Sequence, residues 1–166
     1  YGNAVANFTL HRGFSHSLLV LIPFAALLWL ILRRYYTPVR EAPNPWFWAI
    51  LLALITHPLL DAHTAYGTQL FWPLAVTPTM WSTLFIIDPL YTLPLLVAVI
   101  VVLLAPIRAS AKTALKTGLI VSCLYLGWSW VAKLQVVSAV AERFEMAGEE
   151  LKVFTTPTPF NTLMWR

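Results

Sequence analysis

Four apolar runs, separated by polar or charged segments, dominate the chain, and they cover about residues 17–34, 46–61, 89–107 and 117–135. Each approaches the roughly 20 apolar residues that a helix needs to cross the hydrocarbon core of a bilayer. The second run is the shortest, and we interpret it as a span whose end is buried by neighbouring helices. The pattern predicts an all-α, polytopic membrane protein with about four transmembrane helices.

Composition supports a membrane protein and argues against two other classes. The 166 residues are 59% hydrophobic and only 11% charged, which is more apolar than an ordinary soluble domain. The single cysteine, Cys123, excludes an intramolecular disulfide framework. A net charge of +4 is compatible with nucleic-acid binding, but the basic residues lie at the ends of spans, where they set topology. We therefore expect no nucleic-acid partner.

Basic residues are concentrated in the two loops RRYYTPVREAPNP and RASAKTALK, which follow the first and third spans. Six of them lie there: Arg33, Arg34, Arg40, Arg108, Lys112 and Lys116. By the positive-inside rule these loops are cytoplasmic. The opposite ends of the spans, and everything after the fourth span, are then expected to be extracytoplasmic.

The fourth span is followed by a different kind of sequence. Residues 136–152, VVSAVAERFEMAGEELK, continue the helical pattern with mixed charge, and the tail TTPTPFNTLMWR is broken by prolines. We predict a four-span membrane domain over residues 1–135, and an extracytoplasmic helical stalk with an extended tail over residues 136–166.

Ionisable residues gather at the extracytoplasmic ends of the predicted spans. The group contains all four histidines and two aspartates: His11, His16, His57, His63, Asp61 and Asp88. A single histidine at a membrane interface usually does no more than form hydrogen bonds. Ionisable groups near hydrocarbon depth are costly, however, and are retained mainly when they are paired or functional. Their convergence from different spans favours a metal or catalytic site.

Sequence spacing indicates how these side chains meet. His57 and Asp61 are four residues apart, so both lie on one face of a helix. His63 joins them only if the helix ends after Asp61, and the following TAYGTQLFWP contains turn formers that favour such a break. In the segment before the first span, we place His11 on a loop that bends at Gly13. His16 is then expected in the first turn of that span.

The ligand types indicate the chemistry. Imidazole and carboxylate ligands without thiolate suit a divalent ion, zinc first, with manganese or iron as alternatives. Arg12 suits a phosphate oxygen because its guanidinium is a fixed bidentate donor, although a lipid headgroup would use it equally well. Asp88 is the candidate for proton transfer or for orienting a ligand histidine, and a helix N-cap is its structural alternative.

The segments HRGFSHS, HPLLDAHTAYGTQLFWP and IIDPLYTLPLL resemble a known family. They are similar to the bacterial YdjM-like inner-membrane proteins, also described as LexA-binding, inner-membrane-associated, metal-dependent hydrolases. The resemblance implies a multi-spanning protein of the bacterial inner membrane whose polar core consists of His11, Arg12, His16, His57, Asp61 and His63. Related sequences commonly carry an acidic segment before the HR motif and continue beyond PTPFNTLMWR, so we expect further segments at both ends.

These observations predict a metal-dependent hydrolase acting on a phosphate or carboxylic ester. A lipid-derived substrate from the surrounding membrane is favoured over a soluble small molecule because the site lies at headgroup depth. A metal-ion or proton transporter would also place histidine and aspartate between spans. It needs polar residues through the middle of its spans, however, and the first and third runs have almost none. A non-enzymatic scaffold with a structural metal is the remaining alternative.

Overall fold

Helices make up most of the described part of the chain in the computed structural model, which describes residues 12–106, 109–147 and 154–166. Outside the helices it contains two isolated β-bridges, Thr68 with Thr79 and Pro157 with Trp165. The elements in chain order are η1 (Phe14–His16), α2 (Leu18–Tyr35), α3 (Thr37–Glu41), α4 (Pro43–Ala62), α5 (Pro89–Leu104) and α6 (Ala109–Ala147). The predicted all-α fold is confirmed.

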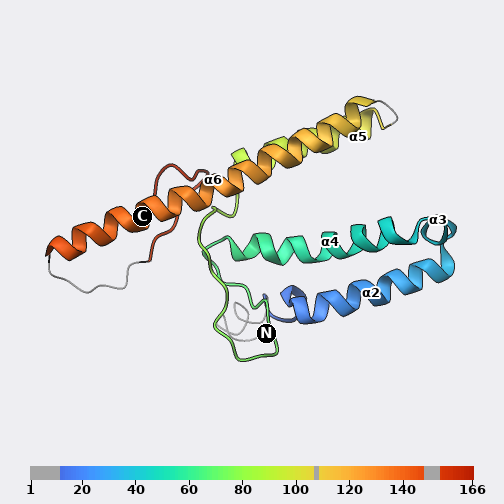
Figure 1. The fold of residues 1–166 in the computed structure, drawn as a ribbon, viewed down its shortest axis with the longest axis horizontal. Helices are drawn as coiled ribbons and strands as arrows, with labels where there is room; N and C mark the ends of the chain where they lie inside the picture. Colours follow the sequence, from blue (N-terminus) through green and yellow to red (C-terminus); the bar gives the residue numbers. More distant parts are fainter. Residues whose placement is uncertain (1–11, 107–108, 148–153) are drawn as a thin grey trace, which may run out of the picture. The chain divides into compact units, whose positions relative to one another are not determined.

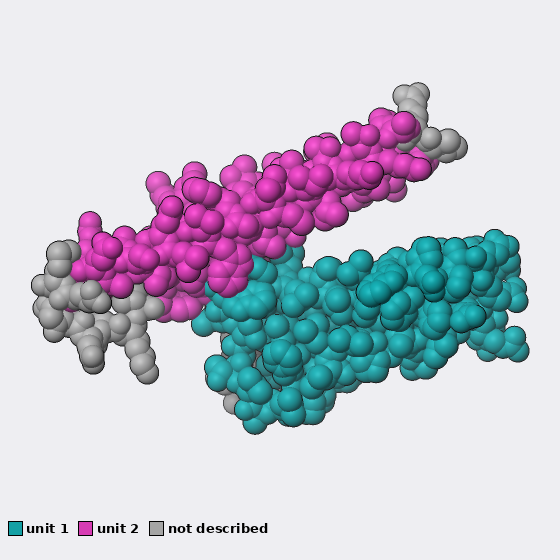
Figure 2. All heavy atoms as spheres, viewed as in Figure 1, with its two compact units in different colours: residues 1–81 teal, residues 82–166 magenta. Residues whose placement is uncertain are grey.

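The chain divides into two compact units, Tyr1–Trp81 and Ser82–Arg166, which are coloured separately in Figure 2. Each unit contains one pair of long helices. The predicted domain boundary after residue 135 falls inside α6, which continues without a break to Ala147.

The first unit is built on an antiparallel helical hairpin. Helices α2 and α4 pack along each other, and the short helix α3 lies in the turn between them (Figure 1). Prolines in the first turns of α3 and α4 favour new helix starts there, because proline has no N–H to leave unpaired and its φ suits a helix. The indole of Trp29 donates to the carbonyl of Pro43 at 2.9 Å and ties the two long helices together at this end. Helix α3 lies in a segment that we predicted to be a loop.

The second unit pairs α5 with the much longer α6 (Figure 1). We predicted a loop up to residue 116, and this was wrong, because α6 already begins at Ala109. Its 39 residues rise about 1.5 Å each and give a helix of roughly 58 Å, about twice the thickness of a hydrocarbon core. Part of α6 therefore extends beyond a bilayer, and this confirms the predicted helical extension after the fourth span.

Three described helices, α2, α4 and α6, are long and apolar enough to cross a membrane, as judged by length and composition. Helix α5 is also apolar but has only 16 residues. With α5 included, the four predicted spans each correspond to one helix.

The pattern of burial is that of helices surrounded by lipid. Most of the buried apolar residues within the helices are alanines, namely Ala25, Ala62, Ala98, Ala111 and Ala132. Large apolar side chains such as Leu27, Leu103 and Leu119 instead point outward. In lipid there is no hydrophobic driving force between helices. Their association therefore depends on the close contact that small residues allow and on hydrogen bonds between helices. One such bond runs from the Ser122 hydroxyl on α6 to the Tyr91 carbonyl on α5, at 2.8 Å.

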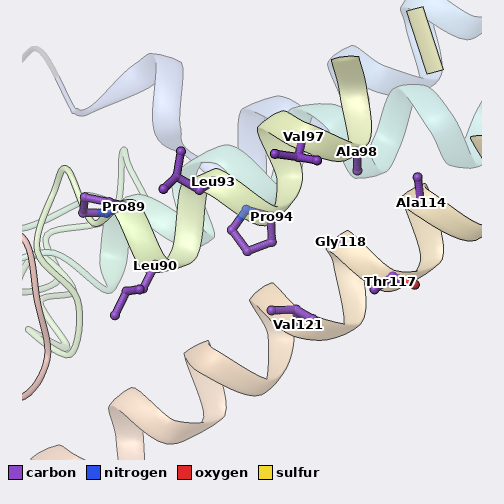
Figure 3. Close-up of a pocket in the computed structure, with 10 residues that line it drawn as sticks. All are labelled: Pro89, Leu90, Leu93, Pro94, Val97, Ala98, Ala114, Thr117, Gly118 and Val121. Carbon is purple, nitrogen blue, oxygen red and sulfur yellow. The ribbon is translucent and has the colours of Figure 1, made fainter. Parts of the chain in front are cut away.

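Helices α5 and α6 lie close together at Gly118 (Figure 3). A Cβ atom at this position would lie 2.7 Å from the Pro94 carbonyl oxygen and 2.8 Å from the Ala98 Cβ. An apolar pocket of about 390 Å³ lies beside this contact. Glycine is therefore required here for space, because any side chain would push the two helices apart.

We expect Gly118→Ala to lower the free energy of unfolding of the second unit by about 1–3 kcal/mol, the usual cost of overpacking a well-packed contact. Gly127→Ala on the same helix is the matched control, because a Cβ there meets nothing within 4 Å. Alanine has the higher helix propensity, so the control should be neutral or slightly stabilising. Thermal unfolding in detergent measures both, and equal melting temperatures for the two variants would contradict the close contact.

The tail after α6 folds back on itself, which corrects our prediction of a simply extended segment. Thr156 and Arg166 exchange both backbone hydrogen bonds, at 3.0 and 2.9 Å, and the Thr158 N–H donates to the Met164 carbonyl at 2.8 Å. The Thr162 hydroxyl donates to the Tyr125 hydroxyl of α6 at 3.1 Å. This turn-rich tail is therefore anchored to the second unit.

Candidate metal centre

Three of the predicted ligands meet at one end of the α2–α4 hairpin. His16 lies on η1, immediately before α2, while His57 and Asp61 lie on α4. The His16 Nε2 atom is 3.2 Å from the Asp61 Oδ2 atom and 3.1 Å from the His57 Nε2 atom. One potential ligand atom from each residue lies within 4.8 Å of the others, so the group could hold a metal ion.

Local structure explains why these side chains converge. The four-residue spacing of His57 and Asp61 places them on the same face of α4, as predicted. His16 is the last residue of the η1 turn, whose first hydrogen bond runs from the His16 N–H to the Gly13 carbonyl at 3.0 Å. We had placed His16 in the first turn of the span itself, and the structure adds this separate turn ahead of it.

The loop after α4 holds the segment that carries His16. The Leu18 N–H donates to the Leu70 carbonyl at 2.9 Å, and the Ser17 hydroxyl donates to the Trp72 carbonyl at 2.6 Å. The Gln69 N–H donates to the Arg12 carbonyl at 3.0 Å. Because this loop leaves α4 just after Asp61, one continuous piece of chain supplies two ligands and positions the third.

The predicted helix break after Asp61 is confirmed, since α4 ends at Ala62. The Thr64 hydroxyl donates to the Asp61 carbonyl at 2.7 Å and so satisfies one of the acceptors freed at the helix end. Gly67 follows with a φ of +74°, a left-handed conformation that glycine adopts without strain. Both residues act as the sequence pattern indicated.

Arg12 lies beside the same cluster and contacts Asp61 and two residues that follow it, Thr64 and Tyr66. Its Nε atom is 3.5 Å from the Asp61 Oδ2 atom, and its Nη1 atom donates to the Thr64 hydroxyl at 3.1 Å. The guanidinium also lies over the ring of Tyr66, 5.1 Å from the ring centre. Tyr66 was not predicted as a site residue, although it belongs to the HTAYG segment that we singled out.

The cluster is open on one side. His16 is buried, Asp61 is intermediate and His57 is exposed. A substrate could therefore approach from the side of His57, whereas the buried side holds the ligands in place.

His63, also predicted as a ligand, lies outside this three-residue group. Its Nδ1 atom donates to the Leu59 carbonyl at 2.9 Å, and its ring packs edge-on against Trp81, with 4.6 Å between ring centres. Burial lowers the pKa of His63 below its ordinary value, and the hydrogen bond to Leu59 opposes only part of this shift. His63 is therefore neutral at pH 7 and contributes to the packing of the loop.

The two remaining candidates are His11 and Asp88. His11 is outside the described residues, so its predicted role as a ligand stays a prediction. Asp88 belongs to the second unit, where it is the N-cap of α5 and accepts a hydrogen bond from the Leu90 N–H at 3.0 Å. Its other carboxylate oxygen accepts from the Tyr125 hydroxyl at 2.8 Å. The N-cap alternative is thus confirmed, and its predicted catalytic role stays a prediction.

The donor set fits a divalent ion. Two imidazole nitrogens and one carboxylate oxygen suit zinc, and also manganese or iron, and three protein ligands are the usual number in a catalytic zinc site. The His16 ring is oriented through its other nitrogen, since Nδ1 is 2.9 Å from the Ser15 hydroxyl. Such a contact orients the ring so that Nε2 is directed at the cluster.

Comparison with known proteins places the chain in a sequence family. The family described as YdjM inner membrane protein matches residues 1–136. A protein of Bacillus subtilis (strain 168), described as "Uncharacterized protein YfhP", is 36% identical over 63 residues. These residues are 38% of this chain and 19% of that protein, so the match spans a small part of the relative's length. No solved structure matches the chain.

Proposed function

The chain belongs to the YdjM inner membrane protein family, and from this premise we propose that it is a membrane-bound, metal-dependent hydrolase of phosphate or carboxylic esters. One observation carries the proposal: His16, His57 and Asp61, from two separate segments, place their ligand atoms within 4.8 Å of one another. Structural packing alone gives no reason to bring two imidazoles and a carboxylate together at the end of an apolar hairpin, where ionisable groups are costly.

His16, His57 and Asp61 would hold the ion, with zinc as the favoured metal and manganese or iron as alternatives. When bound, a divalent ion supplies Lewis acidity and makes water a better nucleophile at neutral pH. The protein's own contribution is to fix the ligands: Ser15 orients His16, and the α4 helix sets the spacing of His57 and Asp61. Arg12, beside Asp61, offers a positive charge to an oxygen of the substrate.

A lipid-derived ester is the favoured substrate. The cluster lies at the end of two membrane-crossing candidates, α2 and α4, which is the depth of the lipid headgroups. The basic residues Arg33, Arg34 and Arg40 lie at the other end of the same hairpin. By the positive-inside rule this arrangement supports an extracytoplasmic site.

The experiment that tests the function compares metal-stripped and metal-reloaded protein purified in detergent. We expect zinc or manganese to restore hydrolysis of at least one substrate among a phospholipid, a phosphomonoester and a carboxylic ester. The expected gain over the metal-free protein is at least 100-fold, because the ion supplies both substrate polarisation and nucleophile activation.

The control for this assay is the same preparation kept in chelator, which reports any contaminating esterase or phosphatase that needs no metal. A protein that binds the ion stoichiometrically but hydrolyses none of the three substrates above this background would contradict the proposal. The metal would then have a structural role.

A further inference from the structure

Arg12 occupies an unusual position for a residue beside metal ligands. Its guanidinium lies next to the Asp61 oxygen that also faces His16, with Nε–Oδ2 and Nε2–Oδ2 distances of 3.5 and 3.2 Å. The side chains of Arg12 and Asp61 are only 14% and 19% exposed, so solvent screens this pair incompletely. The same carboxylate oxygen thus lies beside a permanent positive charge and within the candidate metal site.

Arg12 is held in place by more than Asp61. Its Nη1 atom donates to the hydroxyl of Thr64, which is 3% exposed, and its guanidinium lies over the Tyr66 ring. Among the described residues its other terminal nitrogen, Nη2, has no hydrogen-bond partner. The Thr64 and Tyr66 contacts therefore hold the guanidinium beside the cluster when the Asp61 carboxylate turns toward an ion, and no described residue occupies its Nη2 N–H groups.

A divalent ion bound at this group would lie close to the permanent positive charge of the Arg12 guanidinium. The guanidinium and the ion are both positive, and like charges that lie close together repel strongly in a partly buried site. An oxyanion that contacts both the guanidinium and the ion would cancel this repulsion.

We propose that Arg12 is a resident cation that competes with the divalent ion for Asp61 and makes binding of the ion and binding of an oxyanion mutually favourable. The inference rests on the metal site of the proposed function. It adds that Arg12 and an oxyanion together determine how tightly the ion binds there. By linkage, an oxyanion that strengthens ion binding is itself bound more strongly when the ion is present. The ligand class is a tetrahedral oxyanion such as a phosphate group, whether free or on a lipid.

The opposite role for Arg12 predicts the opposite change in ion affinity when the Arg12 side chain is removed. If Arg12 served only to orient Asp61 toward the ion, its removal would weaken ion binding, as the loss of such support usually does by 10-fold or more. If it competes with the ion, its removal strengthens ion binding. The sign of one affinity change therefore separates the two roles.

The test measures binding of Mn²⁺ to metal-free protein by the electron paramagnetic resonance signal of the free ion. Wild type, Arg12→Gln and Arg12→Lys are titrated in maltoside micelles, with and without inorganic phosphate. Arg40→Gln is the matched control: it removes the same charge at the other end of the hairpin, where Arg40 contacts Thr37. A further series replaces inorganic phosphate with phosphatidic acid in the micelles, which separates a lipid phosphate from a free one.

Without phosphate, we expect Arg12→Gln to bind Mn²⁺ at least 10-fold more tightly than wild type, and Arg12→Lys and Arg40→Gln to remain within about three-fold of wild type. Inorganic phosphate or phosphatidic acid should tighten Mn²⁺ binding to wild type at least five-fold, and should change binding to Arg12→Gln less than two-fold. The source that produces this coupling identifies the oxyanion.

Weaker Mn²⁺ binding by Arg12→Gln, or an equal effect of phosphate on wild type and Arg12→Gln, would overturn the inference. The outcome for the proposed function is separate. A protein that shows the coupling but hydrolyses no ester retains the role of Arg12 and loses the hydrolase, whereas a wild type that binds no Mn²⁺ or Zn²⁺ loses both.

Discussion

Replacement of His57 by alanine is expected to abolish metal binding and to lower metal-dependent ester hydrolysis by at least 100-fold. His57 supplies one of the two imidazoles in the three-residue group, and its Nε2 atom lies 3.1 Å from that of His16. A site left with one imidazole and one carboxylate falls below the three protein ligands of a catalytic zinc site. Metal content per chain, measured by mass spectrometry of the metal, and hydrolysis rates at saturating zinc check this result.

His63→Ala is the matched control for this variant. It removes the same side chain six residues further along, where the ring contacts Leu59 and Trp81 rather than the cluster. We expect His63→Ala to keep its metal and most of its activity. Stoichiometric metal in His57→Ala, or loss of metal in His63→Ala equal to that in His57→Ala, would contradict the assignment of the ligands.

Asp88→Ala is expected to lower the free energy of unfolding of the second unit by about 2–4 kcal/mol. The change removes the α5 N-cap, which is worth about 1 kcal/mol. It also removes the charged acceptor of the Tyr125 hydroxyl, and a hydrogen bond to a charged group contributes about 1.5–3 kcal/mol. Asp88 is 2% exposed, so water cannot replace the lost partner. Thermal and denaturant unfolding in detergent measure the effect.

Asp88→Asn keeps one acceptor oxygen, which can still accept from the Leu90 N–H, whereas its amide nitrogen can only donate to the Tyr125 hydroxyl. It should therefore lose less stability than Asp88→Ala. It also tests the catalytic role that we predicted for this residue. A fall in hydrolysis of 10-fold or more, with metal content and stability near wild type, would support that role. If Asp88→Ala unfolds at the same temperature as wild type, the structural account of the Asp88–Tyr125 contact is wrong.

The apolar runs located the helices because lipid leaves only the backbone's own groups as hydrogen-bond partners, so an apolar run of that length must be helical. The predicted helix boundary was wrong where we interpreted charged residues as the sign of a loop. Lys112 and Lys116 lie within the first turns of α6, in the segment ASAKTALK, which contains three alanines and one leucine. These residues and lysine are good helix formers, so local propensity continued the helix beyond the apolar run.

The candidate site was predictable where it depended on local spacing. His57 and Asp61 share a face of α4 because a helix repeats every 3.6 residues, and the helix break after Asp61 follows from the turn formers beyond it. The positions of His63 and Tyr66 depend on the path of the loop between Ala62 and Trp81. That path is set by contacts with residues 12–18 and has no signal in local sequence.

X-ray absorption at the zinc K-edge of the zinc-loaded wild-type protein measures whether His16, His57 and Asp61 together bind one divalent ion. We expect one zinc per chain with at least two imidazole nitrogens at about 2.0–2.1 Å and oxygen at about 2.0–2.2 Å. A spectrum with fewer than two imidazoles, or a purified protein that retains no zinc, would contradict it.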